Sequence, residues 1–272
     1  MTSSISKSNN TVRRSDGRLL LNADGSACTT LRPLSCELSC LQRADGSSLW
    51  KSGSTQVMAA VYGPIAPRIP SQEKGDEAQV SVVIKSGRHN NANNNSKSNN
   101  SMLEREWEQL LTSILTACID THAYARTVVE VVLQVVQDDG SVLAAALHSS
   151  VAALMDAGVS LTNLPVATTF LLSIHKEKPL LILLDPSSNE ETNPENCVLV
   201  MVTENNDPKR ILATHSMTAT SSKKTKTVAT LSATTVLSCA QAAAKATPAV
   251  VTFWRLAMEQ RVTRESQTLW SS

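Results

Sequence analysis

The side chains that most often carry out chemistry are scattered along this sequence of 272 residues. The cysteines form no CxxC pair and have no histidine close behind them, which argues against a structural zinc site and favours a reduced intracellular setting. The histidines lie on different segments, and there is no Gly-x-Ser-x-Gly nucleophile motif. We therefore interpret both sets as surface or packing residues. They are Cys28, Cys36, Cys40, Cys118, Cys197 and Cys239, and His89, His122, His148, His175 and His215.

Two further patterns could concern phosphate groups. The segment Gly53-Ser54-Thr55 lacks the following lysine and the strand-loop-helix setting that a phosphate-binding loop needs, so it predicts a turn. Basic side chains could contact RNA phosphates by Coulomb attraction, although solvated loop charge is the commoner explanation. These candidates are Lys85 and Arg88, and the group Lys223, Lys224 and Lys226.

Composition excludes several classes of protein. A net charge of +1 gives no strong positive field for non-specific binding of nucleic acid. With only two Tyr, two Phe and four Trp, the chain also lacks the aromatic platform of a stand-alone RNA-binding module. No run approaches the roughly twenty apolar residues of a membrane helix, so we expect no membrane contact.

The first half of the chain predicts strands followed by a helix. Apolar and polar residues alternate over 34–40, which indicates a half-buried strand that ends at the Asp45-Gly46 turn. Residues 49–50 and 56–62 should complete a hairpin, and 79–85 is a further strand candidate. Apolar residues at helical spacing predict a helix over 103–119.

The second half predicts a buried strand, a small-residue helix, more strands and a last helix. The Val/Leu run at 127–137 predicts a central strand, covered on both faces or on one face plus a subunit interface. Ser141 can cap a helix through Asp156, and Gly158 supplies its stop. Strands are expected at 165–174, 180–184 and 197–203, exposed hairpins at 209–231, and a helix at 233–264 that Pro248 must kink or break.

This order predicts one α+β domain. We expect a mobile amino-terminal arm over 1–30, a domain over 31–265, and a tail over 266–272. The Asn-rich tract at 88–101 cannot bury apolar area, so we expect a disordered insertion there.

Several short blocks resemble the RNase PH family. They are Leu31-Arg32-Pro33, Arg43-Ala44-Asp45-Gly46-Ser47, Val61-Tyr62-Gly63-Pro64, Val132-Leu133-Gln134-Val135-Val136, Asp139-Gly140-Ser141 and Ala153-Leu154-Met155-Asp156-Ala157-Gly158-Val159. The likeness covers most of 31–264. It implies a two-layer sheet-and-helix fold, assembled with related subunits into a hexameric ring around a channel for single-stranded RNA.

The resemblance also locates a lost phosphate site. Active members of the family hold phosphate with a Thr-Arg pair just after the Asp-Gly turn, where this chain has Val142-Leu143. Binding a phosphate dianion without charge-assisted donors costs several kcal/mol, whereas the start of a helix returns only about 0.3–2 kcal/mol. We therefore expect no phosphate-dependent cleavage of RNA.

Two acidic residues fall where active members hold a divalent ion, with Glu191 in place of an aspartate and Asp185 as the other ligand. Such oxygen ligands could hold Mg²⁺. The alternative is an ordinary acidic loop that faces solvent; no other cofactor is expected.

The resemblance therefore predicts a non-phosphorolytic ring subunit of a eukaryotic RNA exosome, a scaffold and RNA channel in 3′-to-5′ processing of rRNA and turnover of mRNA. Its expected partners are other RNase PH-like subunits, cap subunits, an associated exonuclease and single-stranded RNA, in the nucleus, nucleolus and cytoplasm. The alternative is a homodimeric, metal-dependent ribonuclease that uses Asp185 and Glu191 outside the ring. Trp50 and Trp254 could anchor a subunit interface or lie in the core.

Overall fold

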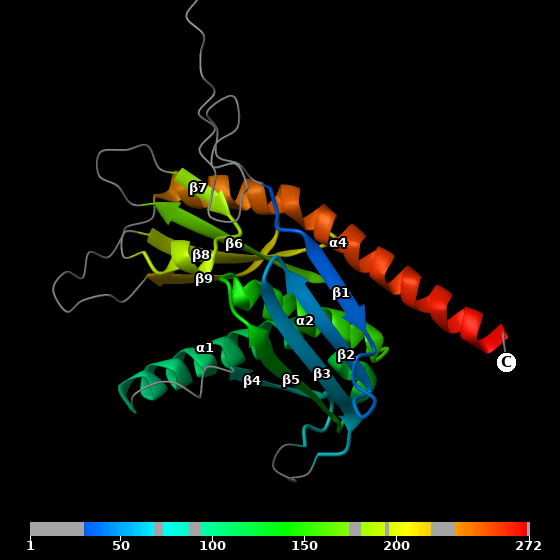
Figure 1. Ribbon diagram of the computed structural model, residues 1–272. Coiled ribbons are helices and arrows are strands. Elements are labelled where there is room, and N and C mark those ends of the chain that lie inside the picture. The colour runs from blue at the N-terminus through cyan, green and yellow to red at the C-terminus, as the bar shows by residue number, and fades with distance from the viewer. Residues whose placement is uncertain are drawn as a thin grey trace, which may run out of the picture.

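The computed structural model describes residues 30–67, 73–86, 94–173, 181–193, 196–218 and 232–270 (Figure 1). Within these ranges the chain forms nine strands and five helices. In chain order they are β1 (Leu34–Leu38), β2 (Gly46–Ser52), β3 (Thr55–Ile65), β4 (Gln79–Ser86), α1 (Asn94–Cys118), the short 3₁₀ helix η3 (Thr121–Tyr124), β5 (Val128–Gln137), α2 (Val142–Asp156), β6 (Pro165–Ser173), β7 (Leu181–Leu184), α3 (Ser188–Glu191), β8 (Asn196–Glu204), β9 (Ile211–Thr218) and α4 (Ala233–Trp270).

The strands form two sheets. The first has the order β1-β2-β3-β5-β4, and all its neighbours are antiparallel except β4 and β5. That parallel pair needs a crossover connection, which α1 supplies. The second sheet has the order β7-β6-β8-β9 and is antiparallel throughout. The predicted strands are therefore confirmed, including one within the stretch 209–231, where β9 pairs with β8.

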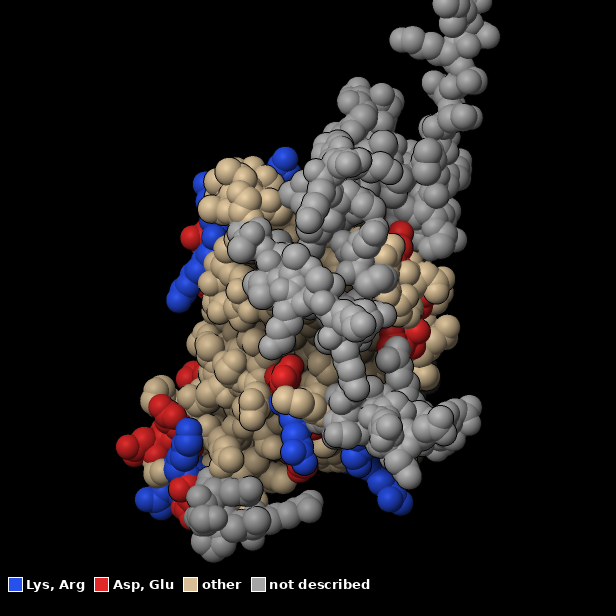
Figure 2. Space-filling view, turned by 90° about the vertical axis from the view of Figure 1, so that its left-hand side faces the viewer, with Lys and Arg blue, Asp and Glu red and all other residues tan. Residues whose placement is uncertain are grey.

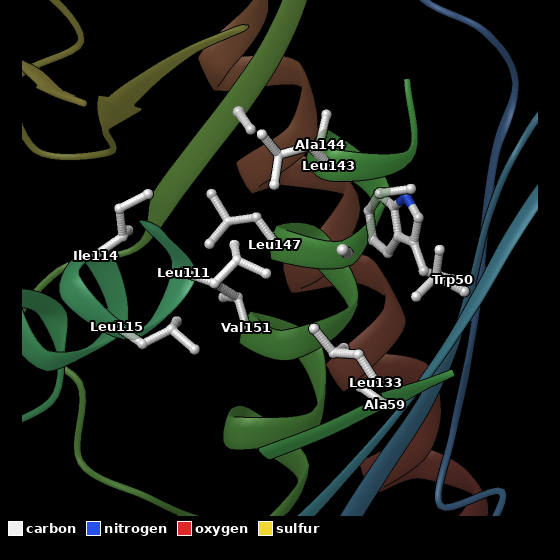
Figure 3. Close-up of a cluster of buried hydrophobic side chains, with 14 of the residues drawn as sticks. Trp50, Ala59, Leu111, Ile114, Leu115, Leu133, Leu143, Ala144, Leu147 and Val151 are labelled. Atoms are coloured by element: carbon white, nitrogen blue, oxygen red, sulfur yellow. The ribbon is translucent and has the colours of Figure 1, made fainter. Parts of the chain in front are cut away.

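Helix α2 contacts strands of both sheets, and the core surrounds it. It contacts β2 and β3 of the first sheet and β6 of the second. Every residue of the helix except Met155 is buried, which its alanines and serines permit because they let strands approach closely. Figure 3 shows Leu147 and Val151 of α2 beside Leu111 and Leu115 of α1. These contacts hold α2 against α1.

An aromatic cluster joins α2 to α4. Trp50 lies 5.1 Å from the His148 ring and 6.0 Å from the Trp254 ring, between ring centroids, and Phe253 meets Trp50 edge-on. Both Trp50 and Trp254 are buried within the chain, at 0% and 1% exposure, so their role as interface anchors is wrong. Burial lowers the pKa of His148 to about 3, and its neutral Nε2 accepts a hydrogen bond from the Ala167 N–H. His148 is a packing residue, as predicted.

The face of β5 that points away from the core is only partly covered. Val129, Val131 and Leu133 are completely buried, whereas the residues between them are partly exposed. The alternative prediction that other parts of the chain cover both faces of β5 is therefore wrong. Helix α2, which contacts β2, β3 and β5, accounts for the buried face.

Three sequence expectations need correction at the helices. Helix α1 begins at Asn94, so 94–101 are helical rather than part of a disordered insertion, because the amphipathic segment that follows can propagate a helix backwards. Helix α4 continues through 266–270, where a tail was expected. It also runs unbroken past Pro248, since Val250 and Trp254 are buried and hold the following turns in place.

The arm at 1–29 and the segment 87–93 lie outside the described residues. Within the described ranges, no helix has the length and apolar character needed to cross a membrane.

Candidate functional site

The candidate site is the junction of the turn at 138–141, the amino terminus of α2 and the loop at 185–188. Gly140 has a φ of +87°, and a Cβ at this position would lie 2.5 Å from the Pro186 carbonyl oxygen. Only glycine lets the two segments approach so closely. Ser188 N–H then donates to the Asp139 carbonyl at 3.1 Å. The turn and the loop are thus in direct backbone contact.

Ser141 precedes α2 in an unexpected conformation. Its φ of 55° is left-handed, and its side chain makes no capping hydrogen bond to the helix. The hydroxyl instead donates to the Pro186 carbonyl at 3.2 Å. The prediction that Ser141 caps α2 is therefore wrong, because a left-handed residue directs its side chain away from the first turn.

The carboxylate of Glu191 caps α2 instead. Its Oε1 accepts a hydrogen bond from the Ser141 N–H at 2.7 Å. A carboxylate at a helix amino terminus is favoured by the unsatisfied N–H groups and by the helix dipole. The position at which an external anion would meet α2 is consequently occupied by an anion of the chain itself.

Val142 and Leu143, where the family resemblance predicts a lost Thr-Arg pair, form the first turn of α2. Their side chains carry no donor, and the two residues are 7% and 4% exposed. The first turn of α2 therefore presents packed hydrocarbon.

Burial makes Glu191 a weak acid. It raises the pKa of the carboxyl from its ordinary value of 4.5 to about 7. The hydrogen bond from Ser141 and the charge of Arg32 oppose this rise, whereas the negative charges of Asp138 and Asp185 add to it. The predicted alternative of a solvent-facing acidic loop does not describe Glu191. Its neighbour Glu190 accepts from the Ser187 N–H and caps the four-residue helix α3.

Arg32 is the residue at this junction that sequence reasoning missed. It is 4% exposed, and its guanidinium donates to the Pro186 carbonyl and lies 3.8 Å from the Asp139 carboxylate. It also donates to Thr55 Oγ1 at 3.4 Å, while that hydroxyl donates to the Gly140 carbonyl at 2.7 Å. In the sequence, Arg32 stands only in a block that resembles the family, and Thr55 stands only in a predicted turn. The one sequence feature that could have indicated a buried role for Arg32 is its position just before the apolar start of a strand.

Asp185 and Glu191 lie in one site, close enough that the negative charge of Asp185 helps to raise the pKa of Glu191. Asp185 Oδ2, however, accepts from the Arg32 backbone N–H at 3.3 Å, as Glu191 accepts from Ser141. Both carboxylates are therefore held by donors of the chain, with a guanidinium nearby. Within the described ranges no three His, Cys, Asp or Glu side chains form a group that could hold a metal ion. This arrangement does not fit a Mg²⁺ site.

The basic candidates are not brought together by the described part of the chain. Lys85 is exposed near the end of β4. Arg88, Lys223, Lys224 and Lys226 lie outside the described residues. Figure 2 shows charges of both signs interspersed on the face it presents, with uncharged surface between them, which agrees with the near-neutral composition.

Comparison with known proteins defines the class to which this fold and site belong. Residues 30–160 match the RNase_PH family, described as the 3′ exoribonuclease family, domain 1. The structure of the archaeal exosome core has the same fold, with a TM-score of 0.65 and 19% identity over 86% of this chain and 91% of that chain. The chain therefore has an RNase PH-like fold, and its residues 30–160 are similar to domain 1 of that family.

Within that class, its relatives include proteins named for Rrp46. The exosome complex exonuclease RRP46 homolog of Arabidopsis thaliana is 37% identical over 171 residues, which are 62% of this chain and 64% of that protein. The exosome complex component rrp46 of Schizosaccharomyces pombe is 36% identical over 47% of this chain and 52% of that protein. The crystal structure of rice Rrp46 has a TM-score of 0.67 and 28% identity, over 86% of this chain and 98% of that chain. The chain matches less than two thirds of the length of these curated relatives.

Proposed function

We propose that this chain is a non-phosphorolytic ring subunit of an RNA exosome. In this role it joins related RNase PH-like subunits around a channel for single-stranded RNA, while a separate exonuclease cuts the RNA. The proposal is supported by the similarity to Rrp46 proteins and by the RNase PH-like fold.

One observation carries the non-phosphorolytic part of the proposal. The amino terminus of α2 is capped by Glu191, and its first turn presents Val142 and Leu143. Inorganic phosphate would have to displace the Glu191 carboxylate or bind beside it. Two negative charges in contact repel each other strongly in a poorly solvated site. The nearest guanidinium, that of Arg32, is already engaged by Pro186 and Asp139.

The alternative, a homodimeric metal-dependent ribonuclease, has less support. Asp185 and Glu191 are held by backbone N–H groups, and Arg32 already supplies positive charge beside them. A divalent ion held by these two carboxylates would have to approach the Arg32 guanidinium, and the two positive charges repel each other. We therefore propose that Asp185 and Glu191 have a structural role at this site.

A ring also accounts for the partly exposed side of β5. Related subunits at either side, cap subunits above the channel and an exonuclease below complete the proposed complex, which acts in rRNA maturation and mRNA turnover in the nucleus, nucleolus and cytoplasm. Lys85, with Arg88, Lys223, Lys224 and Lys226, is the proposed source of contacts to RNA phosphates.

Two measurements test the proposal. Native mass measurement of the tagged protein from its own cells should show a complex with other RNase PH-like subunits; recovery as a free monomer or homodimer contradicts the ring. The pure protein, incubated with single-stranded RNA and inorganic phosphate, should release no nucleoside diphosphates. Robust release contradicts the loss of the phosphate site, whatever the assembly.

A further inference from the structure

A cavity of about 590 Å³ lies beside the amino terminus of α2. Its walls come from α1, α2, α3 and the strands β6, β8 and β9. A volume of this size is typical of sites that enclose a small ligand or a side chain of a partner. The cavity shares part of its lining with the junction described above, but most of its lining residues lie outside that junction; the shared residues are Asp138, Ser141, Val142, Leu143, Ser188 and Glu191.

Three buried polar atoms in the cavity wall have no hydrogen-bond partner in the described part of the chain. They are Trp107 Nε1, Thr169 Oγ1 and His215 Nε2. Thr169 is only 1% exposed, so solvent around the protein does not serve it. Buried polar groups are nearly always hydrogen-bonded, and three exceptions in one cavity indicate an occupant. Because an indole N–H can only donate, the occupant must present an acceptor such as a carbonyl oxygen.

The charges in the wall have one sign. Glu106, Asp138 and Glu191 line the cavity, and no lysine or arginine is found among its described lining residues. Glu106 is exposed and lies where the cavity meets the surface, whereas Glu191 lies largely buried. A phosphate or carboxylate ligand would be repelled here. A cation would be attracted, and more strongly than in water because the walls exclude solvent.

Most of the remaining lining is apolar and includes Leu143, Val200 and Met217, and the rest consists of four serine or threonine residues. A small hydrated metal ion gains nothing from such walls, and the described residues hold no group of three metal ligands. An organic cation with a hydrocarbon stem does gain, because its stem can bury against these side chains while its charged head meets the carboxylates. The combination of cation, hydrocarbon stem and carbonyl acceptor is found in an arginine or lysine residue of a polypeptide.

We propose that this cavity binds a basic side chain, guanidinium or ammonium, from a neighbouring polypeptide whose backbone carbonyl accepts a hydrogen bond from Trp107. The source of that polypeptide rests on the proposed function, since a ring places another subunit against this chain. The chemistry of the cavity does not rest on it.

The test uses the full chain and two matched small probes. N-acetyl-arginine methylamide carries the cation and two carbonyl groups, and N-acetyl-citrulline methylamide has the same shape without the charge. Each is titrated at pH 8, and the indole N–H signal of Trp107, identified by its loss in Trp107→Phe, is followed by NMR. We expect a saturable shift with the arginine probe and binding of the citrulline probe about tenfold weaker, since one desolvated charge interaction is lost.

Two variants localise the binding. Glu106→Gln removes a carboxylate of the cavity, and Glu104→Gln makes the same change on α1 outside the cavity lining. We expect Glu106→Gln to weaken binding of the arginine probe several-fold and Glu104→Gln to leave it unchanged. Equal binding of the two probes, preference for uridine 5′-monophosphate, or no response of Trp107 up to the solubility limit overturns the inference. Arginine binding by a chain that forms no ring would contradict the proposed function and leave this inference standing.

Discussion

Glu191→Gln should make the protein more stable above neutral pH. Glutamine has the shape of a protonated glutamate, and its amide oxygen can still accept the Ser141 N–H at the start of α2. The substitution therefore keeps the cap and removes a negative charge that the folded chain buries.

The magnitude and its sign follow from the pKa. Burial raises the folded-state pKa of Glu191 to about 7, above its ordinary value of 4.5, so the folded protein binds this proton more tightly than the unfolded chain does. Stability from this group is fully present below pH 4.5 and is lost as pH rises through 7. Each tenfold difference in proton affinity is worth about 1.4 kcal/mol, so the loss amounts to about 3 kcal/mol by pH 8.

Urea denaturation of both proteins between pH 4 and pH 8 measures this difference. We expect equal free energies of unfolding near pH 4 and an advantage of about 3 kcal/mol for Glu191→Gln at pH 8. Glu106→Gln, a change to an exposed carboxylate on α1, is the control and should follow the original protein. Parallel curves for Glu191→Gln and the original protein at every pH would refute the burial of Glu191 as an anion at α2.

Three other predictions concern contacts between segments that are distant in the sequence. Arg32→Met should lower the free energy of unfolding by about 1–3 kcal/mol, because it takes a buried donor from the Pro186 carbonyl, and it should raise the pKa of Glu191 further, which NMR titration detects. Asp156→Ala should cost about 3–5 kcal/mol in urea denaturation, because Asp156 is buried and paired with Arg261 of α4. Gly140→Ala should cost about 2–4 kcal/mol, since the new Cβ would meet a backbone oxygen at 2.5 Å.

Matched changes separate these effects from general damage. Glu259→Ala removes an exposed ion pair on the same helix as Arg261 and should cost less than about 1 kcal/mol. Gly158→Ala introduces a side chain at a φ of +72° with nothing within 4 Å, so about 1 kcal/mol of strain is expected. If Asp156→Ala costs no more than Glu259→Ala, or if Gly140→Ala costs no more than Gly158→Ala, the corresponding contact does not support the fold. An unchanged or lowered pKa of Glu191 in Arg32→Met would contradict the electrostatic contact between them.

The sequence alone determined the order of the elements. Alternation predicted β1, the hairpin that should follow it predicted β3, helical spacing predicted the body of α1, and the Asp139-Gly140 turn predicted where α2 begins. It also predicts that the side chains of Val142 and Leu143 cannot hold phosphate, because the absence of a side-chain donor is a property of the residues themselves. These features are local, since each depends on a few neighbours along the chain.

Only the tertiary structure decided what fills the α2 amino terminus. Glu191 is 50 positions from Ser141, and Arg32 is 154 positions from Pro186, so no spacing along the sequence could pair them. The same holds for the orphaned atoms of Trp107, Thr169 and His215, which come from one helix and two strands. Burial, and with it the pKa of Glu191, arises when separate segments exclude water together, and that is a property of the folded chain rather than of any segment.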